Sequence, residues 1–400
     1  MRDNSRAFFS RFTGMLHRIG EKLGYSLATP RIAEVSQSEL LYGTARRSLA
    51  TPRLAWVSQN DIPRPAAIAR ALALGAEIVQ SVSDREAIVK SDGAIDADFA
   101  MPAANWETSE NDYLQAYRLM ASLDWSEIRL LRLRSQCFTG NSLITMGTAL
   151  GLRSIDPIPD DFETKWSDQT RQGISSRWAR YIYGLPGNLV LRTPNILGEA
   201  GWWIDDVLVN LDAVDYQERI NLLNLAGLVD RFCGKDARVL EIGGGYGALS
   251  RALVSILRPS QYVICDLPES LLFSGLYLSL AQGSSTRIAS LSEGLTPGKP
   301  GEICLMPNYL AQKLLLGQHF DLVINTLSMS EMSAHQVATY GALISKAIGS
   351  TGVFFEQNHD NSHLGLLDCR EHLAPSFRRK VAVDAAELPT SRGTAMMWSN

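Results

Sequence analysis

The chain of 400 residues carries 38 lysines and arginines against 42 aspartates and glutamates, so no basic field marks nucleic acid as its main partner. Its composition, 46% hydrophobic and 20% charged, is that of an ordinary globular protein, and its length suggests roughly two or three domains. The five cysteines include no Cys-x-x-Cys pair and no apolar run approaches ~20 residues, so we expect a cytoplasmic protein without disulfides, zinc or a transmembrane segment.

The first predicted element is a basic amphipathic helix near the N-terminus. Its apolar face carries Phe8, Phe12, Met15, Ile19 and Leu23, and its basic residues lie largely elsewhere. Such a helix can dock on its own protein or a partner subunit, lie on a membrane surface, or act as a transit peptide. Residues 27–37 (LATPRIAEVSQ) recur at 49–59 (LATPRLAWVSQ), a local duplication to which no chemistry is assigned.

Residues 63–151 show a mostly helical pattern, with helices expected at 66–76, 112–123 and 125–134. Proline and glycine predict loop-rich connections at 147–159 and 184–198. Tryptophans 166, 178, 202 and 203 fit the core, or could stack on a sugar ring if exposed. Residues 1–200 are thus predicted to form an N-terminal helical or mixed region, which would cap an acceptor pocket or support homo-oligomerisation.

Strands and helices alternate regularly in residues 201–400. Helices are expected at 215–228, 248–257, 268–281, 308–316 and 334–348, and strands at 238–242, 262–266, 302–305, 320–325 and 352–356. A loop is expected at 282–301 and an antiparallel strand pair at 379–383 and 394–398. This order predicts an α/β fold, a mostly parallel Rossmann-like sheet with helices on both faces.

The most informative stretch, residues 238–266, reads RVLEIGGGYGALSRALVSILRPSQYVICD. A glycine turn between a strand and a helix lets backbone N–H groups approach a ligand, and an acid ending the next strand can accept hydrogen bonds from a ribose diol. Gly243-x-Gly245-x-x-Ala248 with Asp266 fits the dinucleotide fingerprint. Glu241-x-Gly243-x-Gly245-x-Gly247 fits the turn of methyltransferases that use S-adenosyl-L-methionine, which has an amino group and no pyrophosphate. Glu241 favours this second interpretation.

Four segments together resemble a family of bacterial sugar O-methyltransferases, often encoded near glycan or glycosylated natural-product genes. They are residues 215–221 (DYQERIN), 240–247 (LEIGGGYG), 266–269 (DLPE) and 324–332 (INTLSMSEM). The resemblance spans about residues 201–358 and extends more weakly through 138–140 (FTG). It implies methyl transfer from S-adenosyl-L-methionine to a sugar hydroxyl. The N-terminal repeat and amphipathic helix lie outside it.

The cofactor contacts are expected at the carboxyl ends of the strands. Glu241 would hold the amino-acid end directly or through water, Asp266 the ribose, and Arg219 the carboxylate unless it only makes a surface ion pair. Leu267 and Met306 would pack on the adenine or lie in the core, and Asn325 would contact the methionine part. The predicted cofactor-binding residues are Arg219, Glu241, Gly243, Gly245, Tyr246, Gly247, Asp266, Leu267, Met306 and Asn325.

The acceptor hydroxyl needs a general base or a metal, because it is a poor nucleophile at neutral pH. His359 or Glu331 would be the base and Asp360 could orient His359; alternatively, Asp360 and Glu331 would help to bind Mg²⁺. Three other functions stay open. They are methylation of a non-sugar metabolite such as a polyketide, a nicotinamide-dependent oxidoreductase, which lacks an evident Tyr-x-x-x-Lys pair, and a catalytically silent scaffold.

Overall fold

The computed structural model describes residues 53–55, 63–103, 112–137, 144–145, 168–360 and 367–400, except for 195, 198–200, 283–284, 296–298, 300, 387, 389 and 391–392. All of these residues belong to one compact unit, Ala50–Asn400. The predicted N-terminal helix and the first repeat copy lie outside the described residues. Of the second copy, only the three residues of strand β1 (Arg53–Ala55) are described.

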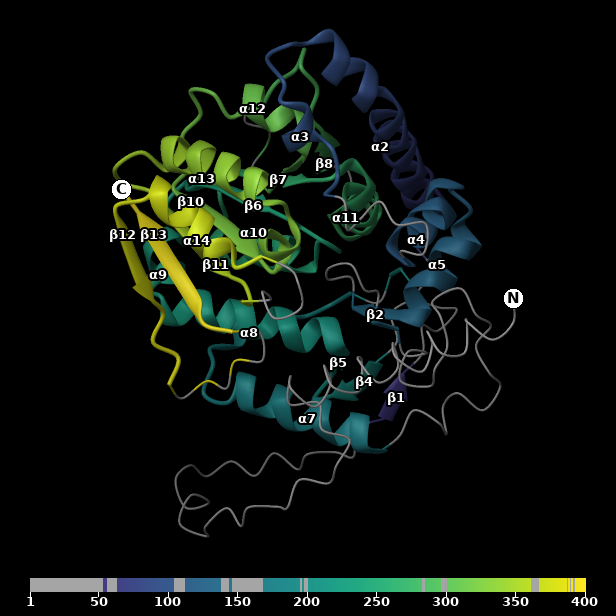
Figure 1. The fold of residues 1–400 in the computed structure, drawn as a ribbon. Helices are drawn as coiled ribbons and strands as arrows, with labels where there is room; N and C mark the ends of the chain where they lie inside the picture. Colours follow the sequence, from purple (N-terminus) through teal and green to yellow (C-terminus); the bar gives the residue numbers. More distant parts are fainter. Residues whose placement is uncertain are drawn as a thin grey trace, which may run out of the picture. The chain divides into compact units, whose positions relative to one another are not determined.

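An eight-stranded sheet forms the centre of the unit, in the order β12-β13-β11-β10-β6-β7-β9-β8 (Figure 1). Its central strands are buried along almost their whole length, as expected where helices cover both faces of a parallel sheet. The strands are β6 (Arg238–Ile242), β7 (Gln261–Asp266), β8 (Thr286–Ile288), β9 (Ile303–Pro307), β10 (Leu322–Thr326), β11 (Val353–Gln357), β12 (Arg379–Ala382) and β13 (Ala395–Ser399).

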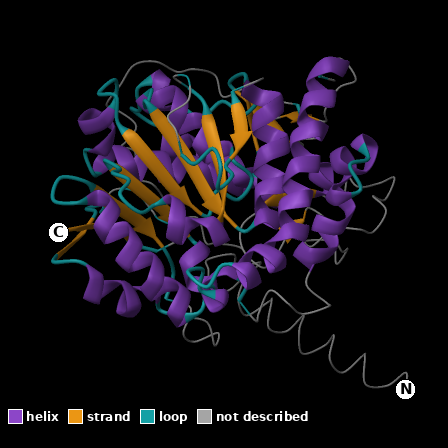
Figure 2. Cartoon of the chain, turned by 90° about the horizontal axis from the view of Figure 1, so that it is seen from above, coloured by secondary structure: helices purple, strands orange, loops and turns teal. Residues whose placement is uncertain are grey.

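Alternate residues of each strand enter different cores, because successive side chains of a strand point to opposite faces. Val239 packs into the core under α10 (Ala248–Leu257) and α11 (Pro268–Gln282). Its neighbour Leu240 packs into the core under α13 (Ala334–Ile348) and α14 (Cys369–Leu373). Figure 2 shows the strands covered by helices on both sides. The predicted Rossmann-like sheet with helices on both faces is confirmed.

The strand order reverses between β6 and β10, which both pair with neighbours in parallel. From β6 the chain moves outward to β7 and β9, and then returns to build β10 and β11 on the other side. Such a reversal point opens a crevice outside the carboxyl ends of the strands, where open α/β sheets bind ligands. The antiparallel strand β13 inserts between β11 and β12, which confirms the predicted terminal pair.

The N-terminal region is mainly helical, as predicted, and part of it packs on the sheet domain. Its helices are α2 (Pro65–Ser91), α3 (Ala97–Ala100), α4 (Asp112–Ala121), α5 (Trp125–Arg134) and α7 (Asp168–Ile182). Helix α2 packs along α11, and buried Arg85 donates to both carboxylate oxygens of Glu269 at 3.0 and 2.8 Å. By length and composition alone α2 could cross a bilayer, a property that it shares with core helices of globular proteins.

Helix α8 (Leu211–Leu225) lies along the carboxyl edge of the sheet (Figure 1). It starts at Asn210, whose Oδ1 accepts a hydrogen bond from the N–H of Ala213 at 2.9 Å. At its middle, Glu218 accepts a hydrogen bond from Gln357, the last residue of β11. Most of the helix is buried, although six of its buried residues are polar or charged: Asp212, Asp215, Gln217, Glu218, Arg219 and Asn221.

Two local predictions differ from the structure. The predicted loop at 282–301 contains the edge strand β8, whose three residues are too few to show an alternating pattern. A hairpin of β4 (Gly201–Ile204) and β5 (Val207–Val209) was not predicted. Asp205 and Asp206 in its turn both have positive φ. Hairpin turns of this kind usually contain Asn-Gly or Asp-Gly, and this sequence has neither pair there.

Candidate functional site

The glycine turn closes the carboxyl end of β6 as the sequence predicted. Gly243 has φ +79° and its N–H donates to the carbonyl of Cys265 at 2.9 Å. A Cβ on Gly243 would collide with the Ser328 hydroxyl, so this position excludes larger residues on steric grounds as well. Gly247, at φ +89°, precedes the first turn of α10. The turn thus brings backbone N–H groups and a helix N-terminus to the edge of the sheet.

Asp266 lies against this turn. Its Oδ2 accepts a hydrogen bond from the N–H of Gly245 at 3.3 Å, and its Oδ1 accepts one from the N–H of Leu267 at 2.8 Å. The carboxyl group is half-buried, and its desolvation raises the pKa of Asp266 to about 6. Hydrogen bonds from the Ser270 side chain and the Gly244 backbone also reach this carboxyl group, so the ribose contact that the sequence predicted stays a prediction. Leu267 is half-buried beside it, before α11.

Glu241 is buried beneath the turn and already has partners within the protein. Its Oε2 accepts hydrogen bonds from the hydroxyls of Ser250 and Tyr262, both at 2.6 Å. Desolvation nevertheless raises the pKa of Glu241 to about 7. The predicted contact with an amino group therefore falls to Oε1 or to a water molecule, since Oε2 is occupied.

Arg219 provides the observation that most directly indicates a ligand. This α8 residue is 1% exposed, its guanidinium lies 5.0 Å from the centre of the Tyr216 ring, and its charge lowers the pKa of Glu241. Its Nε and Nη2 have no hydrogen-bond partner among the described residues. Buried charged donors are normally paired, because an unpaired one costs several kcal/mol. An anionic group beside the turn would satisfy both donors, and a surface ion pair is excluded by the burial.

Tyr246, although it is in the turn, has its ring packed against two other side chains of the protein. The Arg132 guanidinium of α5 lies 3.9 Å from the ring centre, and the Tyr277 ring of α11 lies 4.3 Å away. Arg132 in turn makes a buried ion pair with Asp212 at 2.7 Å. Tyr246 therefore anchors the turn to the N-terminal region and to α8. Sequence reasoning missed Arg132, because no local pattern links α5 to the glycine turn.

Asn325 ties the strand ends together at the reversal point. Its amide donates to the carbonyl of Ile242 at 2.7 Å and to the Ser328 hydroxyl at 2.6 Å, and its oxygen accepts from Asn358 at 2.9 Å. A methionine contact stays a prediction, and both amide hydrogens are already used. Met306 is fully buried in the core on the α13 side, the other place that the sequence allowed for it.

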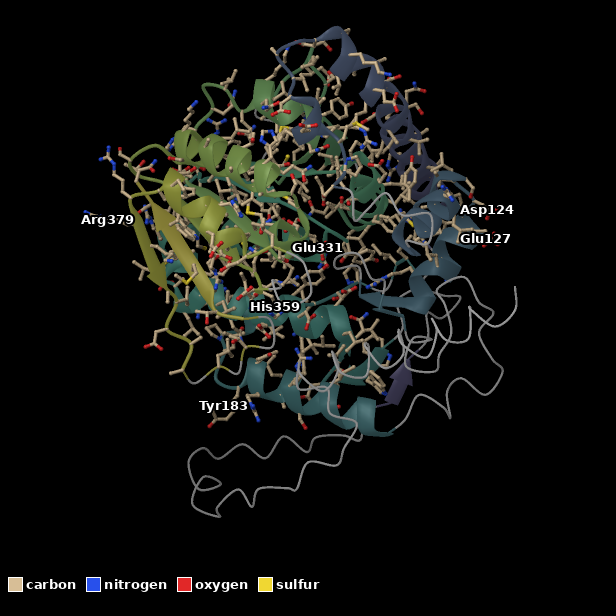
Figure 3. All side chains as sticks on the ribbon, viewed as in Figure 1. Asp124, Glu127, Tyr183, Glu331, His359 and Arg379 are labelled. Atoms are coloured by element: carbon tan, nitrogen blue, oxygen red, sulfur yellow. The ribbon has the colours of Figure 1, made fainter. Side chains whose placement is uncertain are left out.

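The three predicted acceptor-side residues follow the ends of two paired strands. Glu331 ends the 3-10 helix η7 (Ser328–Glu331) after β10, and His359 and Asp360 follow β11 (Figure 3). Glu331 and His359 are half-buried, whereas Asp360 is exposed. Parallel pairing thus brings Glu331 and His359 to the same edge of the sheet as the glycine turn.

A buried network fixes the backbone before His359. Asn358 donates to Glu356 Oε2 at 2.9 Å, and Arg370 donates to Glu356 Oε1 at 2.7 Å and to the Asn358 carbonyl at 3.2 Å. With the bond from Asn358 to Asn325, these contacts hold the end of β11 against β10. Within the described part of the chain, no group of three or more His, Cys, Asp or Glu residues could hold a metal ion, so the Mg²⁺ alternative gains no support there.

The chain matches no family model and no curated protein. Among solved structures it is similar to the N-methyltransferase NodS from Bradyrhizobium japonicum WM9 in complex with S-adenosyl-L-homocysteine (14% identity, 46% of this chain and 85% of that one, TM-score 0.31). It is also similar to magnesium protoporphyrin IX methyltransferase from Synechocystis PCC 6803 with the same ligand (12% identity, 57% of this chain and 93% of that one, TM-score 0.30). A third similar structure is that of the pyocyanin biosynthetic protein PhzM (13% identity, 46% of this chain and 57% of that one, TM-score 0.30). At this similarity neither a substrate nor a reaction follows.

Proposed function

We propose that this protein is an S-adenosyl-L-methionine-dependent O-methyltransferase that acts on a hydroxyl of a sugar or a glycosylated small molecule. The observation that carries the cofactor assignment is the buried Arg219 guanidinium, two of whose donors have no partner among the described residues. The cofactor has three polar ends, and each has a complement here: Arg219 for the carboxylate, Glu241 for the amino group and Asp266 for the ribose diol. A dinucleotide could place its pyrophosphate beside Arg219, but it has no ammonium group to complement Glu241.

The acceptor side rests on the position of His359 and Glu331 after β11 and β10. When bound, S-adenosyl-L-methionine supplies an electrophilic methyl group on a sulfonium. The acceptor oxygen bonds to that carbon as the carbon–sulfur bond breaks, and the hydroxyl proton passes to His359 or Glu331. The protein's own tasks are to hold the oxygen in line with the breaking bond and to take that proton.

The sugar acceptor is supported by the resemblance of residues 215–221, 240–247, 266–269 and 324–332 to sugar O-methyltransferases. The second candidate keeps the same chemistry with a non-sugar metabolite such as a polyketide as acceptor. In either case, the acceptor must reach the edge of the sheet where Glu331 and His359 lie. We place the enzyme in the cytoplasm, since Cys233, Cys265, Cys304 and Cys369 are all free thiols.

Isothermal titration calorimetry with S-adenosyl-L-homocysteine, S-adenosyl-L-methionine, NADH and NADPH tests the cofactor assignment. We expect one site for the two sulfur ligands and no heat from the nicotinamides. At 100 times the dissociation constant, a ligand should also stabilise the fold by ~2.7 kcal/mol in thermal unfolding. Binding of a nicotinamide alone would make Asp266 a dehydrogenase ribose ligand and overturn the proposal. Cofactor binding without turnover on any sugar or polyketide acceptor would favour a silent scaffold.

The affinity for S-adenosyl-L-homocysteine is expected to fall as the pH drops below about 7, because burial raises the pKa of Glu241 to about 7 and that of Asp266 to about 6. Protonation of Glu241 removes the charge that would pair with the ligand amino group, and protonation of Asp266 removes a charge and one acceptor for the ribose. Well below its pKa, each group should raise the dissociation constant by ~10-fold for each unit that the pH falls. Calorimetry between pH 5 and 8 measures this, and Asp266→Asn should bind weakly with a flatter profile. A wild-type affinity equal at pH 5 and 8 would contradict it.

A further inference from the structure

A cavity of about 680 Å³ lies beside α8, and none of its lining residues belongs to the glycine turn. Its walls come from the end of α7 and the turn after it, from the second half of α8, and from the segment that follows β12. None of the residues predicted from the sequence to bind the cofactor or to act in catalysis lines it. Its volume is within the range of small-molecule sites in proteins.

The lining combines exposed apolar surface with a few polar groups. Tyr183 is 81% exposed and Leu225 is 53% exposed, although large apolar side chains are usually covered. Figure 3 shows Tyr183 beyond the end of α7. Arg180, Asn224 and Asp384 add donors and acceptors to the same walls. A pyranose ring matches such a surface, because one face presents C–H groups to an aromatic ring and its edge carries hydroxyls.

Contacts link this cavity to the edge of the sheet where methyl transfer would occur. Tyr181, in the cavity wall, donates its hydroxyl to Glu218 Oε2 at 2.6 Å. Glu218 Oε1 accepts from the amide of Gln357 at 2.8 Å, two residues before His359. The wall and the end of β11 are therefore joined through one buried carboxylate.

Two described residues after β12 give a second link. Leu388 lines the cavity, and Gly393, five residues later, lies next to His359: a Cβ on Gly393 would be 3.5 Å from His359 Nδ1. Five residues span at most ~18 Å. The cavity wall and the surroundings of His359 are therefore joined by a short stretch of chain.

We propose that this cavity binds the saccharide part of the acceptor, with Tyr183 stacked on a pyranose ring and Asn224 and Asp384 bound to its hydroxyls. The inference rests on the proposed function, since it concerns the acceptor of the same reaction. The cavity holds the sugar that is recognised, and the hydroxyl to be methylated extends from it towards His359. Tyr183 is then a residue that determines acceptor specificity.

Saturation-transfer NMR on the full chain with saturating S-adenosyl-L-homocysteine tests this proposal. The probes are the p-nitrophenyl glycosides of glucose, galactose, mannose and rhamnose, with free p-nitrophenol as the aglycone control. We expect signal on the ring C–H protons of at least one glycoside. Tyr183→Ala should weaken that glycoside ~10-fold or more, while Tyr183→Phe, which keeps the ring, should retain most of the affinity. Leu316→Ala, at a 63% exposed residue outside the cavity lining, serves as the matched control.

The outcomes separate this inference from the proposed function, because the affinity for S-adenosyl-L-homocysteine is measured in the same variants and should not change. Ring-proton signals that persist in Tyr183→Ala, or no glycoside signal at all, overturn the inference even if the cofactor binds. Equal signals from p-nitrophenol and the glycosides show an apolar site and also overturn it. If a glycoside binds in a Tyr183-dependent way but S-adenosyl-L-homocysteine does not bind, the saccharide site is supported and the proposed function is contradicted.

Discussion

Replacing Arg219 by methionine is expected to weaken the binding of S-adenosyl-L-homocysteine by ~30- to 3,000-fold. Methionine keeps much of the volume in this buried position but removes the donors that pair with the ligand carboxylate. Loss of one partner of a buried charge pair in a complex typically costs ~2–5 kcal/mol, which corresponds to that range. Calorimetry with the wild type and the variant gives the ratio directly.

Arg132→Met is the matched control, because Arg132 is a second buried arginine that already has a partner. Its ion pair with Asp212 is within the protein, so the variant strands a buried carboxyl and should lose ~3–5 kcal/mol of unfolding free energy. Arg219→Met should lose less unfolding free energy, since Nε and Nη2 of Arg219 have no hydrogen bond to any described residue. An Arg219→Met variant that binds the ligand as tightly as the wild type would remove the main support for the cofactor site.

Replacing His359 by alanine is expected to lower kcat by ~10²- to 10⁴-fold, the usual contribution of a positioned general base. The acceptor oxygen must lose its proton as the new bond forms, and His359 is half-buried at the end of β11 on a backbone fixed by Asn358. The measurement is steady-state methylation of a sugar acceptor that the wild type turns over. The affinity for S-adenosyl-L-homocysteine should stay the same.

Glu331→Gln and Asp360→Asn complete that experiment. If Glu331 is the base, Glu331→Gln shows the large loss of kcat and His359→Ala does not, which would reassign the role to the residue after β10. Asp360 is exposed and adjacent to His359, so Asp360→Asn should lower kcat if Asp360 orients His359 and should have a small effect if it does not. Full activity in both His359→Ala and Glu331→Gln would exclude a side-chain base at these positions.

The sequence by itself determined the core of the fold and one half of the proposed cofactor site. The turn from Glu241 to Gly247 and Asp266 lies within one strand–turn–helix–strand unit, in which the periodicity of apolar residues and the glycines act locally. The same local patterns predicted most of the alternating strands and helices and the antiparallel pair at the C-terminus. A buried strand needs only a short apolar run to be recognised.

The tertiary structure alone decided the rest of the site, because it depends on contacts between distant parts of the chain. Gln357 reaches Glu218 across 139 residues, and Arg132 reaches the Tyr246 ring from the N-terminal region. Helix α8 carries polar residues that would suit a solvated surface, yet it is buried along the sheet edge. Trp178 and Trp202 are in the core, while Tyr183 is exposed at a cavity. Burial and partners are set by packing between elements, which no local pattern of residues records.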